Sequence, residues 1–235
     1  MSTAIKFCGM TREVDVARAA ELGAAYVGVI FAGGPRTLTI DEARAILKGA
    51  PPGLRRVGVF GDHSAEEIRA VVDALALDVV QLHADPSPDH IARVRGAVDA
   101  DVWPVLRIAG AVLPPRATEV AAAASAVVLD ARISGALGGT GVRLPWTELA
   151  GVIDSLRVKP VVLAGGLTPD NVAMAIGTMS PDVVDVSSGV ERGPGIKDHE
   201  RMRAFRDAVA AAGRGGAEER AVAVDAGPAM REGTR

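Results

Sequence analysis

The only cysteine of the chain, Cys8, ends the first apolar segment, where a glycine turn separates that segment from a helical pattern. Asp130 ends another apolar segment much further along the chain. In a barrel of parallel strands the carboxyl ends of the strands face the substrate, so these two side chains can act from opposite sides of one opening. A thiol and a carboxyl group placed across a sugar form a general acid–base pair for an isomerisation. Each also has a structural interpretation: Cys8 as a small buried hydrophobe, and Asp130 as a cap of the following loop.

Two glycine-rich turns follow the last two apolar segments and contain Gly165-Gly166 and Ser188-Gly189. Glycine lets the backbone approach oxygen atoms closely, and a helix N-terminus adds N–H donors and a positive dipole. The loops after the seventh and eighth strands form the usual phosphate site of such barrels. One turn alone is equally well explained by turn geometry. The two together predict that the backbone at Gly165, Gly166, Ser188 and Gly189 binds phosphate.

Three further side chains are candidates for substrate binding. Arg36 follows a Gly-Gly-Pro turn and can hold a carboxylate through two parallel hydrogen bonds, although a solvated loop arginine is the plainer interpretation. His83 ends an apolar segment and contacts either substrate or a neighbouring side chain. Asp185 reaches a sugar hydroxyl or forms an ion pair with Arg107 or Lys6. We therefore expect Arg36 to hold a second anionic group of the substrate, beside the phosphate.

Another glycine cluster, 138–141, lies in the long segment after Asp130 and is interpreted either as a lid or as a linker. The spacing of His, Cys and carboxylate residues predicts no metal site.

The segments that must position these residues alternate between apolar runs and helical patterns. Several apolar runs are nearly continuous Val, Leu and Ile, as is typical of parallel strands covered on both faces. The predicted strands begin at Ala4 and then cover 25–31, 56–61, 78–83, 102–108, 126–130, 160–164 and 183–187. The predicted helices cover 12–22, 40–47, 65–75, 88–98, 114–123, 145–155, 169–177 and 199–212.

Eight strand-then-helix units predict an α/β fold, a single closed (β/α)8 TIM barrel. We expect residues 1–212 to form the barrel and 213–235, where the pattern gives way to Gly, Ala, Glu and Arg, to form a flexible C-terminal tail. We expect Asp41 to cap the second helix and Ser64 to cap the third, with Glu67 as its capping-box partner. Thr168 and Pro169 are expected to be the cap and first-turn proline of the seventh helix.

Composition narrows the functional class. Of 235 residues 49% are hydrophobic and only 3% aromatic, which predicts an aliphatic core. The net charge of −3, from 26 basic and 29 acidic residues, gives no basic surface for nucleic acid. The lone cysteine fits a reducing compartment, and neither a signal peptide nor a membrane span of ~20 apolar residues is seen. We expect a cytoplasmic monomer or homodimer that binds a small molecule, not nucleic acid or membrane.

Ordered motifs from residue 4 to about 212 resemble the phosphoribosylanthranilate isomerase family of tryptophan biosynthesis. The matching segments are 6–11, 35–36, 57–60, 81–83, 138–141, 146, 163–172, 185–191 and 195–198.

The resemblance implies the Amadori rearrangement of N-(5′-phosphoribosyl)anthranilate to 1-(2-carboxyphenylamino)-1-deoxy-D-ribulose 5-phosphate, without a cofactor. It implies that Asp130 is the general acid that opens the furanose ring. Cys8 is then the general base that removes the proton from C2′, and Arg36 is the partner of the anthranilate carboxylate. Two alternatives stay open: another phosphosugar barrel enzyme, and a barrel that binds a phosphate ligand without catalysis.

The acid–base assignment requires a protonated Asp130 and an ionised Cys8. Reference pKa values of ~3.9 for Asp and ~8.5 for Cys favour the opposite arrangement by roughly 6 kcal/mol. A cation near the thiol, such as Arg36 or Lys6, would favour the thiolate. We expect the two groups to titrate as a coupled pair.

Overall fold

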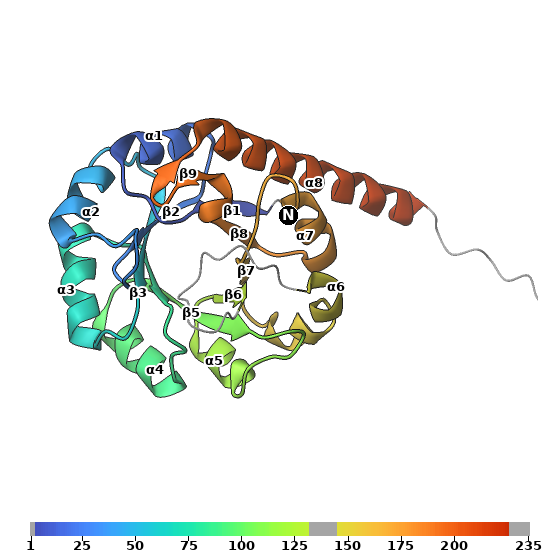
Figure 1. Ribbon diagram of the computed structural model, residues 1–235. Helices are drawn as coiled ribbons and strands as arrows, with labels where there is room; N and C mark the ends of the chain where they lie inside the picture. The colour runs from blue at the N-terminus through green and yellow to red at the C-terminus, as the bar shows by residue number, and fades with distance from the viewer. Residues whose placement is uncertain (1–2, 132–144, 226–235) are drawn as a thin grey trace, which may run out of the picture.

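The computed structural model describes residues 3–131 and 145–225, except for the side chains of residues 131 and 214–225. Eight parallel strands pair in chain order and close between β8 and β1, with the helices arranged around the outside (Figure 1). The predicted barrel is therefore confirmed. The strands are β1 Ala4–Phe7, β2 Tyr26–Ile30, β3 Arg55–Phe60, β4 Val79–Leu82, β5 Asp101–Ile108, β6 Val127–Ala131, β7 Val161–Leu163 and β8 Val183–Val186.

Side chains along each strand alternate between the barrel interior and the layer of helices, as the period of two requires. On β1, Ile5 and Phe7 belong to the core between sheet and helices, and the Phe7 ring lies 6.1 Å from the ring of Phe205 on α8. Residues of the opposite parity, Lys6 and Cys8, therefore face inward. A second cluster of buried hydrophobic side chains, which includes Trp103, fills the inside of the barrel. Chemistry is thus left to inward residues at the carboxyl ends of the strands.

The helices are α1 Glu13–Glu21, α2 Ile40–Leu47, α3 Ala65–Leu75, α4 Pro88–Ala97, α5 Ala117–Ala123, α6 Trp146–Leu149, α7 Val172–Met179 and α8 His199–Asp225. Ser64 and Glu67 form the predicted capping box of α3. The predicted cap at Asp41 is wrong, because Thr39 caps α2 and makes a capping box with Glu42. Local pattern places a helix start only to within a turn, and the residue whose side chain reaches the N3 amide decides the cap.

Helices α6 and α7 depart from their predicted boundaries. The segment predicted as one helix over 145–155 is split into α6 and a 3-10 helix, Val152–Leu156. The start predicted at Thr168-Pro169 is wrong, because α7 begins at Val172. The residues before it stay in the loop, where the Asn171 side chain bonds back to Gly166 and Thr168.

After β8 the chain makes a short 3-10 helix, Ser188–Val190, and a two-stranded sheet of β9 Glu191–Gly193 and β10 Ile196–Lys197. Sequence reasoning missed this sheet, which places two charged residues beside the barrel opening. Helix α8 continues past the predicted end at residue 212 and extends beyond the barrel (Figure 1). The division into a barrel and a tail at 213–235 stays a prediction, and residues 226–235 lie outside the described part.

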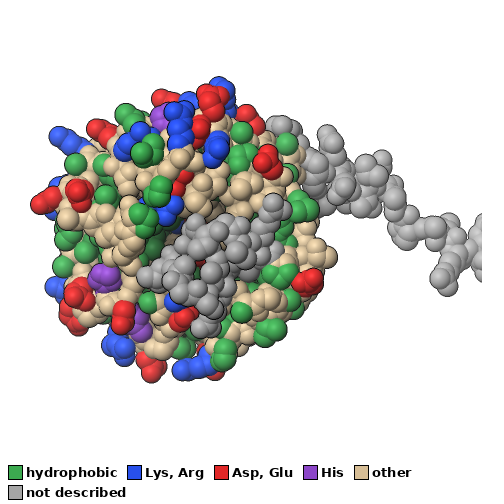
Figure 2. Space-filling model, viewed as in Figure 1, with side chains coloured by type: hydrophobic (Ala, Val, Ile, Leu, Met, Phe, Trp, Pro, Cys, Tyr) green, Lys and Arg blue, Asp and Glu red, His purple; other side chains and the backbone are tan. Residues whose placement is uncertain are grey.

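In the same orientation, acidic and basic side chains are interspersed around the periphery of the surface, over the helices (Figure 2). In the described part of the chain, no helix is long and apolar enough to cross a membrane. The glycine cluster at 138–141, interpreted as a lid or a linker, lies outside the described residues.

Candidate active site

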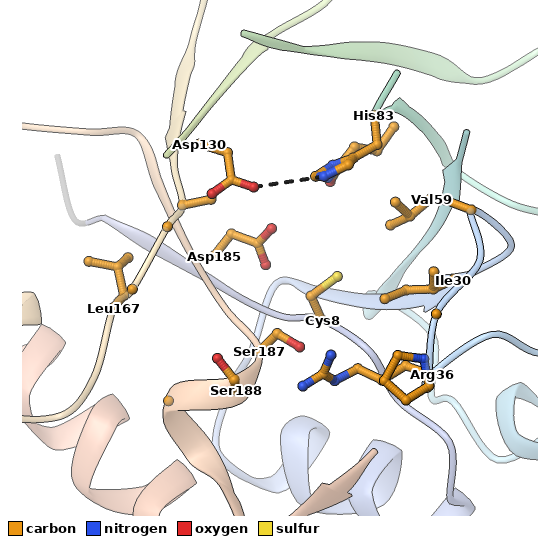
Figure 3. A pocket seen from close by; sticks show the side chains of 18 of the residues that line it. Cys8, Ile30, Arg36, Val59, His83, Asp130, Leu167, Asp185, Ser187 and Ser188 are labelled. Carbon is orange, nitrogen blue, oxygen red and sulfur yellow. Dashed lines mark ion pairs between the residues drawn. The ribbon is translucent and has the colours of Figure 1, made fainter. Parts of the chain in front are cut away.

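A cavity of about 380 Å³ opens at the carboxyl ends of the strands. It has the size and position of a small-molecule site in a barrel of this kind. All of the residues predicted for the site line this one cavity: Cys8, Arg36, His83, Asp130, Gly165, Gly166, Asp185, Ser188 and Gly189. In the close-up, the side chains of Cys8, Asp130, Asp185 and His83 point into a shared space (Figure 3).

The Cys8 thiol is free and only 7% exposed, yet it lines the cavity at the end of β1. Gly28, on the neighbouring strand β2, makes room for it: a Cβ there would lie 2.8 Å from the sulfur. Burial raises the pKa of the thiol, and the adjacent Lys6 ammonium acts in the opposite direction. The sulfur is thus placed for chemistry in a site where its ionisation depends on nearby charges.

Asp185 on β8 forms a buried ion pair with Lys6 on β1, its neighbour in the sheet register. The Lys6 Nζ donates to Asp185 Oδ2 at 2.7 Å, and Lys6 is fully buried. Of the two cations considered for Asp185, the structure shows Lys6, whereas the Arg107 Nε donates to Asp85 at 3.1 Å. Within the described residues, Asp185 Oδ1 has no hydrogen-bond partner, so Asp185 keeps one oxygen for the cavity.

His83 at the end of β4 faces Asp130 on β6, with 3.9 Å between Nε2 and Oδ2 (Figure 3). Burial, and then the charges of Arg107 and Lys6, lower the pKa of His83 to about 4. Its imidazole is therefore neutral near pH 7. Neither ring nitrogen makes a hydrogen bond within the described part of the chain, so this neutral ring offers a donor and an acceptor next to the candidate acid.

Arg36 is held by a protein carboxylate that sequence reasoning did not identify. Its Nε and Nη2 donate to the two oxygens of Glu191 at 2.9 and 2.7 Å, and this pairing raises the pKa of the guanidinium. Lys197 donates to the same carboxylate at 2.7 Å and also to the carbonyl oxygens of Cys8 and Ser187. The small β9–β10 sheet thereby ties Arg36 to the backbone at Cys8.

The two glycine turns meet at the other side of the cavity. Gly165 and Gly166 have φ values of +85° and +70°, which favour glycine. A Cβ on Gly189 would lie 1.9 Å from the Leu167 carbonyl oxygen, so only glycine lets these loops approach each other.

The same turns leave donors available at the cavity. Within the described residues, the backbone N–H groups of Gly165, Gly166, Ser188 and Gly189 donate to no backbone carbonyl. Asn171, through its Nδ2, donates to the Gly166 carbonyl at 2.9 Å and braces the first of the two loops. Available backbone N–H groups at paired loops are suited to an anion.

Sequence reasoning assigned no role to four residues that shape the site: Gln81, Asn171, Glu191 and Lys197. Gln81 lines the cavity beside His83 and points inward by the same parity. Alternation along the predicted strand at 78–83 was a signal that could have found it. The other three lie in loops or short strands, where no local periodicity distinguishes a buried polar side chain from an exposed one.

Over residues 3–131 and 145–225, no group of three or more His, Cys, Asp or Glu side chains could hold a metal ion. The expectations of no metal and no cofactor stay predictions.

Comparison with known proteins identifies a family to which this chain is similar. The model of the family described as N-(5′-phosphoribosyl)anthranilate (PRA) isomerase matches residues 5–208. The N-(5′-phosphoribosyl)anthranilate isomerase of Pseudomonas fluorescens (strain SBW25) is 39% identical over 205 residues, which cover 87% of this chain and 94% of the relative.

Solved structures give the same result. The crystal structure of phosphoribosyl anthranilate isomerase from Thermotoga maritima has a TM-score of 0.81 at 30% identity, covering 89% of this chain and 99% of the other. A phosphoribosyl anthranilate isomerase in complex with reduced 1-(o-carboxyphenylamino)-1-deoxyribulose 5-phosphate has a TM-score of 0.78 at 30% identity, with the same coverage. From the matched family model and these identities, the chain belongs to the N-(5′-phosphoribosyl)anthranilate isomerase family.

Proposed function

We propose that this cavity converts N-(5′-phosphoribosyl)anthranilate into 1-(2-carboxyphenylamino)-1-deoxy-D-ribulose 5-phosphate, a step of tryptophan biosynthesis, by general acid–base catalysis without a cofactor. The observation that carries the proposal is the convergence of Cys8 and Asp130 on one cavity, in a chain of this family. Asp130 protonates the furanose ring oxygen, the C1′–O bond breaks, and a protonated Schiff base forms. Cys8 then takes the proton from C2′, and the bonding electrons form the enolamine that becomes the ketone.

The two ends of the substrate are assigned to opposite parts of the cavity. The phosphate binds at Gly165, Gly166, Ser188 and Gly189, where backbone N–H groups are available. The anthranilate carboxylate binds Arg36. Because Glu191 takes the Nε and Nη2 side of that guanidinium, we assign the substrate to its outer Nη1–Nη2 edge.

His83 and Asp185 are assigned to substrate hydroxyl groups. Both present buried polar atoms to the cavity that make no hydrogen bond within the described residues. An unsatisfied buried polar atom is costly, and a sugar hydroxyl would satisfy it.

The test is turnover of the anthranilate sugar, followed by the loss of its fluorescence. Cys8→Ala and Asp130→Asn should each lower kcat by ~10²-fold or more while the circular dichroism spectrum is retained. Asp85→Asn is the matched control, since Asp85 pairs with Arg107 outside the cavity lining. Substrate binding without turnover by the unmodified protein would instead support a binding barrel.

Two further proposals rest on the sequence alone. The protein is a monomer or a homodimer, and it is located in the cytoplasm, which fits a chain with one free cysteine. Sedimentation velocity measures the first.

A further inference from the structure

Lys6 is a fully buried lysine that has no part in the acid–base steps proposed above. It lies one inward position before Cys8 on β1 and is hydrogen-bonded to Asp185. We infer that Lys6, oriented by Asp185, is a positioning residue that stabilises the ionised form of the Cys8 sulfur against the cost of burial, for its role as base. This inference rests on the proposed function of the cavity, and its test is designed to be separable from it.

The strand places the Lys6 and Cys8 side chains close to each other. Residues two apart on a strand point to the same side, so Lys6 and Cys8 share the inner face of β1. Both rest against Gly28 of β2: a Cβ there would lie 2.8 Å from the sulfur and 3.4 Å from Lys6 Cε. The charge of the Lys6 ammonium also lowers the pKa of the Cys8 thiol, against the effect of burial. The absence of a side chain at Gly28 leaves room for both side chains on the same side of the barrel wall.

A buried ammonium has strong requirements of its own. It carries three N–H donors and no acceptor, and its burial without an anionic partner is costly. Asp185 supplies one partner at 2.7 Å and raises the pKa of Lys6, so the ammonium stays charged. A thiolate at Cys8 supplies a second anion to the same group, whereas a neutral thiol is only a weak acceptor.

The local charge balance also favours an ionised sulfur. Around Cys8 the described residues place three cations, Lys6, Arg36 and Lys197, against two carboxylates, Asp185 and Glu191. The excess is one positive charge, which a thiolate neutralises. Across the cavity, His83 is neutral near pH 7, and Asp130 is the protonated acid in the proposed reaction. Replacing Lys6 with a neutral residue removes the excess and makes a thiolate unfavourable.

The experiment uses the fact that Cys8 is the only thiol in the chain. Its ionisation is followed by thiolate ultraviolet absorbance against pH and by the rate of alkylation with iodoacetamide, with Cys8→Ser as the blank. Lys6→Met should shift the titration to higher pH and slow alkylation at neutral pH by about tenfold or more. Asp185→Asn should shift the titration in the opposite direction, because it removes a negative charge and leaves the ammonium to the sulfur. Lys6→Arg should restore part of the wild-type behaviour.

Lys197→Met is the matched control: Lys197 is a second buried lysine with a carboxylate at 2.7 Å, but it contacts the Cys8 carbonyl oxygen instead of the sulfur. It should shift the titration less than Lys6→Met. A purely structural ion pair predicts loss of stability in Lys6→Met and Asp185→Asn without opposite shifts. An unchanged titration in Lys6→Met, or shifts of the same sign in the two variants, would overturn the inference. If Lys6→Met does not fold, the sign of the shift in Asp185→Asn decides.

These measurements need no substrate. Full isomerase activity in Cys8→Ser would refute the proposed role of Cys8 as base, whatever the titration shows. A titration that does not respond to Lys6, in an enzyme that loses activity in Cys8→Ala, would refute only the role of Lys6.

Discussion

At the scale of single residues, His83 and Arg36 show how burial and pairing set the properties of the cavity. His83 lies 3.9 Å from the Asp130 carboxyl group yet is neutral near pH 7. Burial, with the charges of Arg107 and Lys6, lowers its pKa more than Asp185 and Asp85 raise it. Arg36 is fixed by Glu191 on one edge, so it enters substrate binding already oriented. Fixed donors avoid the loss of side-chain freedom that binding would otherwise cause.

The lowered pKa of His83 makes a prediction about stability. The pKa is about 4 in the folded chain against its usual 6.5, so the unfolded chain binds more protons between these values. The contribution of His83 to the free energy of unfolding is therefore fully present above pH 6.5. It is lost as the pH falls towards 4, by up to ~3 kcal/mol. Urea unfolding at several pH values should show that slope, and it should be shallower in His83→Gln. Equal slopes in the two proteins would contradict the lowered pKa.

The pairing of Arg36 makes a prediction about binding. Arg36→Lys keeps the positive charge but cannot bind Glu191 on one edge and a carboxylate on the other. We expect KM for the anthranilate sugar to rise about tenfold or more, with a smaller change in kcat, in steady-state kinetics. An unchanged KM would show that Arg36 does not bind the carboxylate of the substrate.

At the scale of elements, the loops after β7 and β8 depend on each other. Gly189→Ala places a methyl group 1.9 Å from the Leu167 carbonyl oxygen, so one loop must move away from the other. We expect a lower melting temperature and weaker binding of inorganic phosphate, measured by calorimetry. Gly177→Ala on α7 is the matched control, because a Cβ there meets no atom within 4 Å and Ala favours a helix by roughly 1 kcal/mol. Phosphate binding that is equal in both variants would argue against the assigned phosphate site.

Helix α8 makes a separate prediction. Met202, Phe205 and Val209 are its buried side chains among those described, and all lie before residue 213. Ending the chain after Gly213 should therefore leave the melting temperature and kcat/KM within about twofold of the full chain. A large loss in either would show that residues 214–235 contribute to the barrel.

At the scale of the whole molecule, repeated local patterns were enough to predict the barrel. Apolar runs at regular spacing identify the strands, and the rule that strand ends carry chemistry predicts that Cys8, Asp130 and the glycine turns line one cavity, as they do. These inferences succeed because each depends on a segment and its parity, and both can be read from neighbouring residues.

Contacts between distant segments were harder to predict. The Arg36–Glu191 pair and the contact of Lys197 with Cys8 join residues 155 and 189 positions apart. They exist only because β8 closes on β1 and the β9–β10 sheet folds back over that junction. The capping residue Thr39 of α2 and the start of α7 at Val172 were missed for a different reason: several nearby side chains can cap, and loop geometry selects one of them.

The alternation on β1 has a consequence for how sequence change can reach the catalytic centre. An insertion or deletion of one residue within Ala4–Phe7 would reverse the inward–outward alternation of the strand and turn the Cys8 sulfur outward, towards α8. The same change would turn the Phe7 ring into the cavity and place the Lys6 ammonium in the hydrophobic core between the barrel and the helices. Such a shift would strongly destabilise the fold. The apolar side chains on the outer face of β1 therefore fix the direction in which the Cys8 sulfur points.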